Sequence, residues 1–137
     1  MFSCQKGKGV YLNGHKVNAS QKTNLLDASI TVSRSELKRK EWEPYRNDFK
    51  SINPIGSVAY NLALVSSGDY DIFTTIAPKN EWDICAGNCI VNEAGGKLID
   101  LSGKERIYNQ ENTLIFPGLI AGEISAVEKT FSVLRIP

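Results

Sequence analysis

The sequence is poor in the residues that mark several common classes of protein. It contains three cysteines and one histidine among 137 residues. An odd number of cysteines argues against a disulfide framework and favours a reducing compartment. No apolar run approaches the ~18 residues of a membrane span, and lysines and glycines follow the first residues too soon for a signal peptide. We expect a soluble, cytoplasmic protein that does not bind a membrane.

An excess of charge of either sign is absent as well. Sixteen basic residues against fifteen acidic ones give a net charge of +1, which predicts no binding to a nucleic acid polymer. The length suits a single domain, which we place at residues 1–137. Alternating strand and helix patterns predict an α/β fold, in which helices form layers on a mixed sheet.

The most informative stretch spans residues 80 to 96 and predicts one helix. Asn80 is a good N-cap, and Asp83 places a carboxylate in the first turn, where exposed N–H groups favour it. Gly95-Gly96 supplies the stop. Gly87 in mid-helix costs about 1 kcal/mol relative to alanine. We therefore expect another segment to approach the backbone at Gly87.

Apolar residues recur at helical spacing on one face of this helix. They include Trp82, Cys85, Cys89 and Ile90, so we expect this face to be buried. Cys85 and Cys89 lie four positions apart and could in principle bind zinc. The single histidine, His15, is distant in the sequence, so small core residues are the favoured role for both cysteines.

Asp83 has two interpretations. It is either a structural carboxylate at a helix start, which the pattern alone favours, or a ligand for a metal or for substrate hydroxyls. Gly56-Ser57 has a similar ambiguity, because the pair opens a helix. Its backbone N–H groups could face a hydroxyl or an anion, and a simple cap is the alternative.

The rest of the chain alternates between extended and helical segments. The acidic residues Glu36, Glu41 and Glu43 surround a basic cluster, and this mixture predicts a solvated helix face. Strands are expected at residues 2–4, 10–12, 16–17, 29–33, 51–55, 70–76, 97–101, 114–116 and 119–121, and the other helices at residues 36–42, 58–65 and 123–134.

Three motifs carry a resemblance to a known family. The helix region contains EWDICAG at residues 81–87 and EAGG at residues 93–96, and KGKGVYLNG occurs near the N-terminus at residues 6–14. Together they resemble the C-terminal half of the inositol monophosphatase family, which consists of magnesium-dependent phosphomonoesterases. The resemblance implies that Asp83 is a catalytic Mg²⁺ ligand close to the substrate. It also implies that Gly56, Ser57 and Val58 lie against the substrate, a small phosphorylated metabolite.

The family's remaining metal ligands are missing from this sequence. They come from an upstream glutamate and an Asp-Pro-(Ile/Leu)-Asp-Gly-(Ser/Thr) motif, and neither occurs here. We therefore expect the C-terminal domain of such an enzyme, without the N-terminal catalytic half and inactive in isolation. Its partner would be that half or a second copy of the chain. The rival prediction is a non-catalytic half-domain that binds a ligand or a partner.

The resemblance implies that the substrate is an inositol phosphate, another sugar phosphate, or adenosine 3′,5′-bisphosphate. Ser33-Arg34-Ser35 and the segment PKNEWD at residues 78–83 resemble the bisphosphate nucleotidase branch of the family. Glu36 stands where that branch has a histidine, which weakens the nucleotide assignment. The family often has a glutamate near Thr74 or Thr75 that holds a substrate hydroxyl. Its absence here weakens a strictly inositol-specific assignment.

Overall fold

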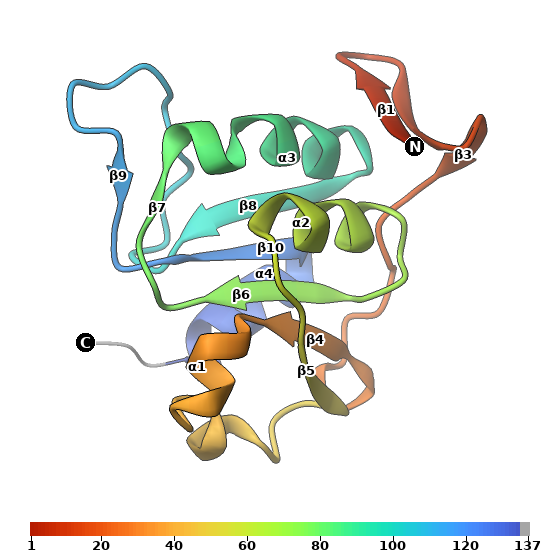
Figure 1. Cartoon of the computed structure of the whole chain (residues 1–137). Coiled ribbons are helices and arrows are strands. Elements are labelled where there is room, and N and C mark those ends of the chain that lie inside the picture. The colour runs from red at the N-terminus through yellow and green to blue at the C-terminus, as the bar shows by residue number, and fades with distance from the viewer. Residues whose placement is uncertain (135–137) are drawn as a thin grey trace.

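The computed structural model describes residues 1–134, so the last three residues of the predicted domain lie outside the described part (Figure 1). The strands are β1 (Phe2–Gln5), β2 (Gly9–Leu12), β3 (His15–Val17), β4 (Ser29–Val32), β5 (Ser51–Pro54), β6 (Ile72–Thr75), β7 (Lys79–Asn80), β8 (Gly96–Asp100), β9 (Leu114–Ile115) and β10 (Leu119–Glu123). The helices are α1 (Arg34–Lys38), α2 (Val58–Ser66), α3 (Glu81–Glu93) and α4 (Ile124–Val133), with short 3-10 turns η1 (Leu25–Asp27) and η2 (Glu43–Tyr45).

Five strands form a mixed sheet in the order β5-β4-β6-β10-β8. Strand β4 runs parallel to β5 and β6, whereas β10 runs antiparallel to β6 and β8. Helices α2 and α3 lie beside each other on one face of this sheet (Figure 1). The predicted α/β fold with a mixed, helix-covered sheet is therefore confirmed.

Adjacent residues of the central strands serve opposite faces of the sheet, as strand geometry requires. On β6, Phe73 packs under α2 and α3, whereas Ile72 packs on the other side with α4. On β10, Leu119 and Ile120 divide in the same way. The domain thus has two apolar layers, one on each side of the sheet.

A second sheet of three antiparallel strands, in the order β1-β2-β3, packs against the C-terminal part of α3. The Glu93 carboxylate accepts hydrogen bonds from the backbone N–H groups of Gly7 (2.9 Å) and Gly9 (3.0 Å) in the β1–β2 loop. Val10 and Ala94 form part of a small apolar cluster beneath the sheet. The predicted hairpin is confirmed, and Glu93 fixes it on the helix.

Helix α3 begins and ends where the sequence predicts, and its mid-helix glycine has the expected close neighbour. A Cβ atom at Gly87 would lie 2.9 Å from Cβ of Leu62 on α2, which is closer than real Cβ atoms approach. The absence of a side chain at Gly87 therefore allows α2 and α3 to pack closely.

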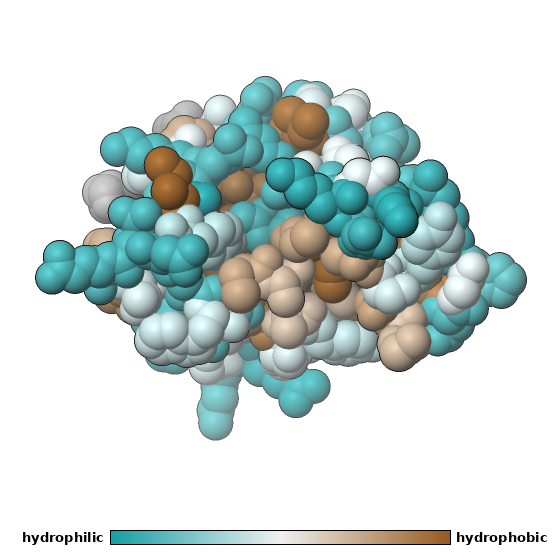
Figure 2. All heavy atoms as spheres, turned by 90° about the horizontal axis from the view of Figure 1, so that it is seen from above, coloured by the Kyte–Doolittle hydropathy of each residue, from teal (hydrophilic) through white to brown (hydrophobic). Residues whose placement is uncertain are grey.

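The predicted buried face of α3 is wrong. Trp82 is 68% exposed, and Cys85 and Cys89 are also exposed. The buried face instead carries Ile84 and Val91, together with Gly87 and Asn88, because α2 and the sheet lie on that side. Figure 2 looks onto α2 and α3 and shows apolar atoms at the surface in the middle of this view.

The charged segment after β4 also differs from its prediction. The helix α1 ends at Lys38, and the chain turns through η2 instead of continuing to residue 42. Glu36 is fully buried and is not part of a solvated face. The helix expected at residues 123–134 is α4, in which Val127 is buried and Phe131 is 38% exposed. Among residues 1–134, none of the helices combines the length and apolar character that crossing a membrane requires.

Candidate functional site

Three of the four residues predicted to contact substrate, Gly56, Ser57 and Val58, line one small cleft of about 60 Å³, and the fourth, Asp83, does not. It lies where β5 ends and α2 begins, beside the end of β6. The other residues of its lining are Ser33, Ile55, Asn61, Phe73, Thr75 and Lys79. The structure thus brings the segment 56–58 together with the N-cap of α1 and with segments of β6 and β7.

Ser57 shapes the floor of the cleft through an unusual backbone conformation. Its φ is +66°, in a region that residues other than glycine rarely adopt, at a cost of roughly 1–3 kcal/mol. Its hydroxyl accepts a hydrogen bond from the N–H of Tyr60 (3.3 Å), so Ser57 is also the N-cap of α2. Backbone strain of this kind concentrates at functional sites, and capping and ligand binding are compatible at this position.

Two basic side chains flank the cleft. A Cβ atom at Gly56 would lie 3.4 Å from Cζ of Arg34, so the guanidinium lies directly against this glycine. Lys79 belongs to the lining itself. Two cations beside the N-terminus of α2 create a positive potential, which favours an anionic ligand such as a phosphate group.

Asn61 adds a buried polar group that the sequence analysis did not identify. Its Nδ2 donates to the carbonyl oxygens of Ser57 (2.8 Å) and Ile55 (3.1 Å), which fixes the side chain. Its Oδ1 has no hydrogen-bond partner within residues 1–134, although the residue is only 2% exposed. A buried acceptor is costly to leave unpaired, so this oxygen is suited to accept a ligand or water hydrogen. The signal in the sequence that points to Asn61 is an amide side chain near the start of an otherwise apolar helix.

Asp83 lies in the first turn of α3 and is exposed to solvent. Its Oδ2 accepts a hydrogen bond from the backbone N–H of Asn80 (3.1 Å), which is the structural role that the pattern favours. Asp83 is not among the residues that line the cleft. Asp83 is nevertheless close to the cleft along the chain, because Lys79 lines the cleft and is followed directly by Asn80 and α3.

The residues present do not form a complete magnesium site. Magnesium requires an octahedral set of oxygen ligands, and protein sites supply carboxylates for it. No group of three or more His, Cys, Asp or Glu side chains that could hold a metal occurs in the described part of the chain. Asp83 could therefore serve as one ligand of a site that is completed by other residues. The same finding gives no support to zinc at Cys85 and Cys89.

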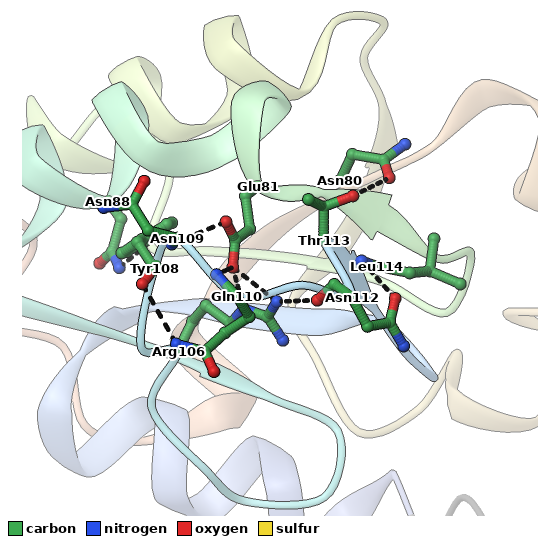
Figure 3. Close-up of polar contacts among 10 residues, drawn as sticks. All are labelled: Asn80, Glu81, Asn88, Arg106, Tyr108, Asn109, Gln110, Asn112, Thr113 and Leu114. Carbon is green, nitrogen blue, oxygen red and sulfur yellow. Dashed lines mark hydrogen bonds and ion pairs between the residues drawn. The ribbon is translucent and has the colours of Figure 1, made fainter.

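Glu81, next to Trp82 at the start of α3, anchors a long surface loop (Figure 3). Its Oε1 accepts hydrogen bonds from Arg106 Nε (2.8 Å) and Nη2 (2.5 Å), and Oε2 accepts one from the N–H of Asn109 (2.9 Å). Glu81 as a residue is only 7% exposed. Nearby, the Asn88 amide donates to the Tyr108 hydroxyl (2.7 Å). Glu81 thus holds the loop against the helix that carries Asp83.

The environment of Glu81 favours its charged form. Burial raises the pKa of its carboxyl group, but the hydrogen bonds from Arg106 and from the backbone of Asn109 and Gln110 together outweigh this effect. The pKa of Glu81 is consequently lower than the ordinary value of 4.5.

Glu36 is hydrogen-bonded to a segment that borders the cleft. Its Oε1 accepts hydrogen bonds from the Thr75 hydroxyl (2.5 Å) and from the N–H groups of Ile76 (3.1 Å) and Ala77 (2.9 Å). Thr75 belongs to the lining of the cleft. The side chain at this position therefore faces the protein interior, and its contacts fix the segment that leads to Lys79.

An α/β domain with basic side chains around a helix N-terminus has the features of proteins that bind small phosphorylated molecules. A model of the inositol monophosphatase family matches residues 1–129. The chain belongs to the inositol monophosphatase family.

Individual relatives agree with this assignment. The chain is 36% identical over 124 residues to the fructose-1,6-bisphosphatase/inositol-1-monophosphatase of Thermotoga maritima, covering 90% of this chain and 48% of the relative. It is 33% identical over 113 residues to inositol monophosphatase 1 of Solanum lycopersicum, covering 77% and 41%. The solved IMPase structure of Thermotoga maritima superposes with a TM-score of 0.80 at 29% identity, covering 97% of this chain and 50% of that chain. This chain spans about half the length of the curated relatives it matches.

Proposed function

We propose that this chain is the C-terminal, substrate-positioning half of a magnesium-dependent phosphomonoesterase. The observation that carries the proposal is the cleft of Gly56, Ser57 and Val58, with Arg34 and Lys79 beside it. This arrangement suits a phosphate ester, because cations and helix N–H groups both stabilise its negative charge. The names of the curated relatives support the reaction class.

Each group of the cleft then has a role in holding the substrate. Arg34 and Lys79 neutralise the phosphate, and the Ser57 hydroxyl and the Asn61 Oδ1 orient hydroxyl groups of the alcohol portion. Asp83 faces solvent at the start of α3, where it provides one carboxylate ligand. Magnesium, when bound by the complete set of ligands, would supply Lewis acidity and lower the pKa of a bound water.

The favoured substrates are inositol and sugar phosphates. One relative is named both a fructose-1,6-bisphosphatase and an inositol-1-monophosphatase, and it matches 90% of this chain. Adenosine 3′,5′-bisphosphate is the alternative. Glu36 argues against it, because the side chain at the position of the nucleotidase histidine is buried and bonded to Trp42, Thr75 and the backbone.

A separate observation favours a partner for this half. The outward face of the N-terminal part of α3 carries Trp82 and Cys85 at the surface, where apolar groups gain free energy on being covered. We propose that the segment supplying the remaining metal ligands covers this face, in the same chain or in another. A non-catalytic half-domain would use the same face to bind a different partner.

The decisive experiment measures phosphate release in millimolar Mg²⁺. The substrates are inositol 1-phosphate, fructose 1,6-bisphosphate and adenosine 3′,5′-bisphosphate. The purified chain should release no phosphate, whereas a fusion to the N-terminal half of the Thermotoga maritima relative should be active. In that fusion, Asp83→Asn should lower kcat/KM by at least about a hundredfold, as loss of a charged group from a reaction centre does.

Asp69→Asn is the matched control, because Asp69 is also exposed but follows α2, away from the cleft lining. It should leave kcat/KM unchanged within twofold. Hydrolysis by the isolated chain would contradict the predicted inactivity. An active fusion that tolerates Asp83→Asn would contradict the role of Asp83.

A further inference from the structure

We propose that Cys4 and Cys89 form a reversible disulfide site that fastens the three-stranded sheet to α3. Their Sγ atoms lie 3.7 Å apart, although the two residues are separated by 85 positions in the sequence. All three cysteines of the chain are free thiols in this structure. The site requires neither substrate nor metal, so it stands independently of the proposed phosphatase function.

Contacts between the three-stranded sheet and α3 hold the two thiols close together. Cys4 lies in β1, and Cys89 lies in α3, one helical turn before Glu93. Glu93 binds the backbone N–H groups of Gly7 and Gly9 in the loop that follows β1, so the strand is kept at a fixed position along the helix. The proximity of the thiols is therefore a consequence of sheet docking rather than of two mobile side chains.

The distance also permits bond formation. A disulfide requires an S–S separation of about 2.05 Å, so the sulfur atoms must approach by rotation of the two side chains. Cys89 is exposed and Cys4 is half-buried, which leaves room for this movement at the surface.

The reaction is a thiol–disulfide exchange with a small-molecule disulfide such as glutathione disulfide. The Cys89 thiolate attacks one sulfur of this oxidant, forms a mixed disulfide and releases one glutathione thiolate. Cys4 then loses its proton and attacks Sγ of Cys89, which releases the second glutathione thiolate. Two protein thiols are oxidised to one disulfide, and one glutathione disulfide is reduced to two thiols.

The environment sets the order of these two steps. Burial raises the pKa of the Cys4 thiol, and the hydrogen bond and charge of Cys89 and the charge of Glu93 raise it further. Cys4 is therefore the poorer first nucleophile, and the exposed Cys89 reacts first. In a reducing compartment both thiols stay reduced, and the bond closes only when the thiol pool becomes oxidised.

Peptide mapping gives a direct test. The folded chain is incubated with glutathione disulfide, alkylated and digested with trypsin, which places Cys4 in the peptide 1–6 and both Cys85 and Cys89 in the peptide 80–97. We expect a cross-linked pair of these peptides, a loss of 2 Da from the intact protein, and a Tm several degrees higher. A disulfide that closes so long a loop stabilises the fold mainly by restricting the unfolded chain.

Cysteine variants decide between Cys85 and Cys89. Cys85→Ser should retain the cross-link and the rise in Tm, whereas Cys89→Ser should lose both. A disulfide within the peptide 80–97, a persistent glutathione adduct without a cross-link, or an undiminished cross-link in Cys89→Ser would each overturn the proposal. Reduction with dithiothreitol should return the Tm to its starting value, and a failure to do so would contradict reversibility.

Discussion

The indole Nε1 of Trp42 donates a hydrogen bond of 3.0 Å to Oε2 of Glu36 inside the core, where the two residues are 1% and 0% exposed. The second oxygen of the same carboxylate receives three donors from the end of β6 and the residues that follow it. One buried side chain thus connects α1, the turn at residue 42 and the segment that leads to the cleft. A buried carboxylate of this kind is tolerated because its oxygens are hydrogen-bonded.

Replacement of Glu36 should be strongly destabilising. Glu36→Ala leaves the indole N–H and the donors of Thr75, Ile76 and Ala77 buried without an acceptor, at roughly 1–3 kcal/mol for each group that finds no water. We expect the free energy of unfolding to fall by about 3 kcal/mol or more, measured by urea denaturation. Glu41→Ala is the control, since Glu41 forms a surface pair with Arg39 and should cost less than about 1 kcal/mol. An equal effect of the two variants would contradict the role assigned to Glu36.

Gly87→Ala should destabilise the domain although alanine is the better helix former. The helix propensity gain is about 1 kcal/mol, but the new methyl group meets Leu62 on α2, and overpacking of this kind costs about 1–3 kcal/mol. We expect a net loss in thermal or urea unfolding. In a Leu62→Ala background the space is open, so the same substitution should be neutral or stabilising. A stabilising effect in the wild-type background would show that α2 moves aside at little cost.

The ion pair of Glu81 predicts a pH dependence of stability. The pKa of Glu81 is lower in the folded chain than its ordinary value of 4.5, so the unfolded state binds more protons near this pH. The stabilisation is therefore complete above about pH 4.5 and is lost as the pH falls through the folded pKa. Glu81→Gln should lower Tm at pH 7, and the difference from wild type should shrink below pH 4.5. Glu111→Gln, at an exposed position of the same loop, should show no such change.

Binding of inositol 1-phosphate by the chain should depend on the two cations of the cleft. Arg34→Ala and Lys79→Ala should each weaken binding about tenfold, the effect of losing one charge-assisted contact of about 1.4 kcal/mol. NMR titration of backbone amides gives the affinity and should show the largest shifts at residues 56–58. Lys129→Ala is the control, because Lys129 on α4 donates to the carbonyl of Thr23, outside the cleft. Equal affinities of all variants would place the phosphate elsewhere.

Local signals in the sequence predicted the ends of α3 well. Asn80 starts the helix and the glycine pair at residues 95–96 ends it, and both effects depend on the residue type at the position itself. The buried face of α3 was mispredicted because both faces carry apolar residues at helical spacing. Ile84 and Val91 are buried since α2 and the sheet lie on their side, and no local pattern shows which side that is.

The residues of the candidate cleft could be predicted from the sequence only where they are consecutive. Gly56, Ser57 and Val58 are consecutive, so one motif located all three, and they do line one cleft. Asp83 lies in the expected first turn but outside that lining, and its proposed ligand role needs residues from elsewhere. The lysines and the arginine that follow Glu36 predict a surface position for it, whereas its partners at residues 75–77 lie about forty positions further along the chain. Such contacts between distant segments are set by the tertiary fold alone.

The three-stranded sheet has two edges that differ in their chemistry. Its outer strands β1 and β3 each have one side unpaired within the described residues, and unpaired strand edges are templates for further strands. Lys16 in β3 opposes such pairing by its charge, whereas β1 contains no charged residue. Of the two edges, β1 is therefore the one whose sequence opposes a further strand less.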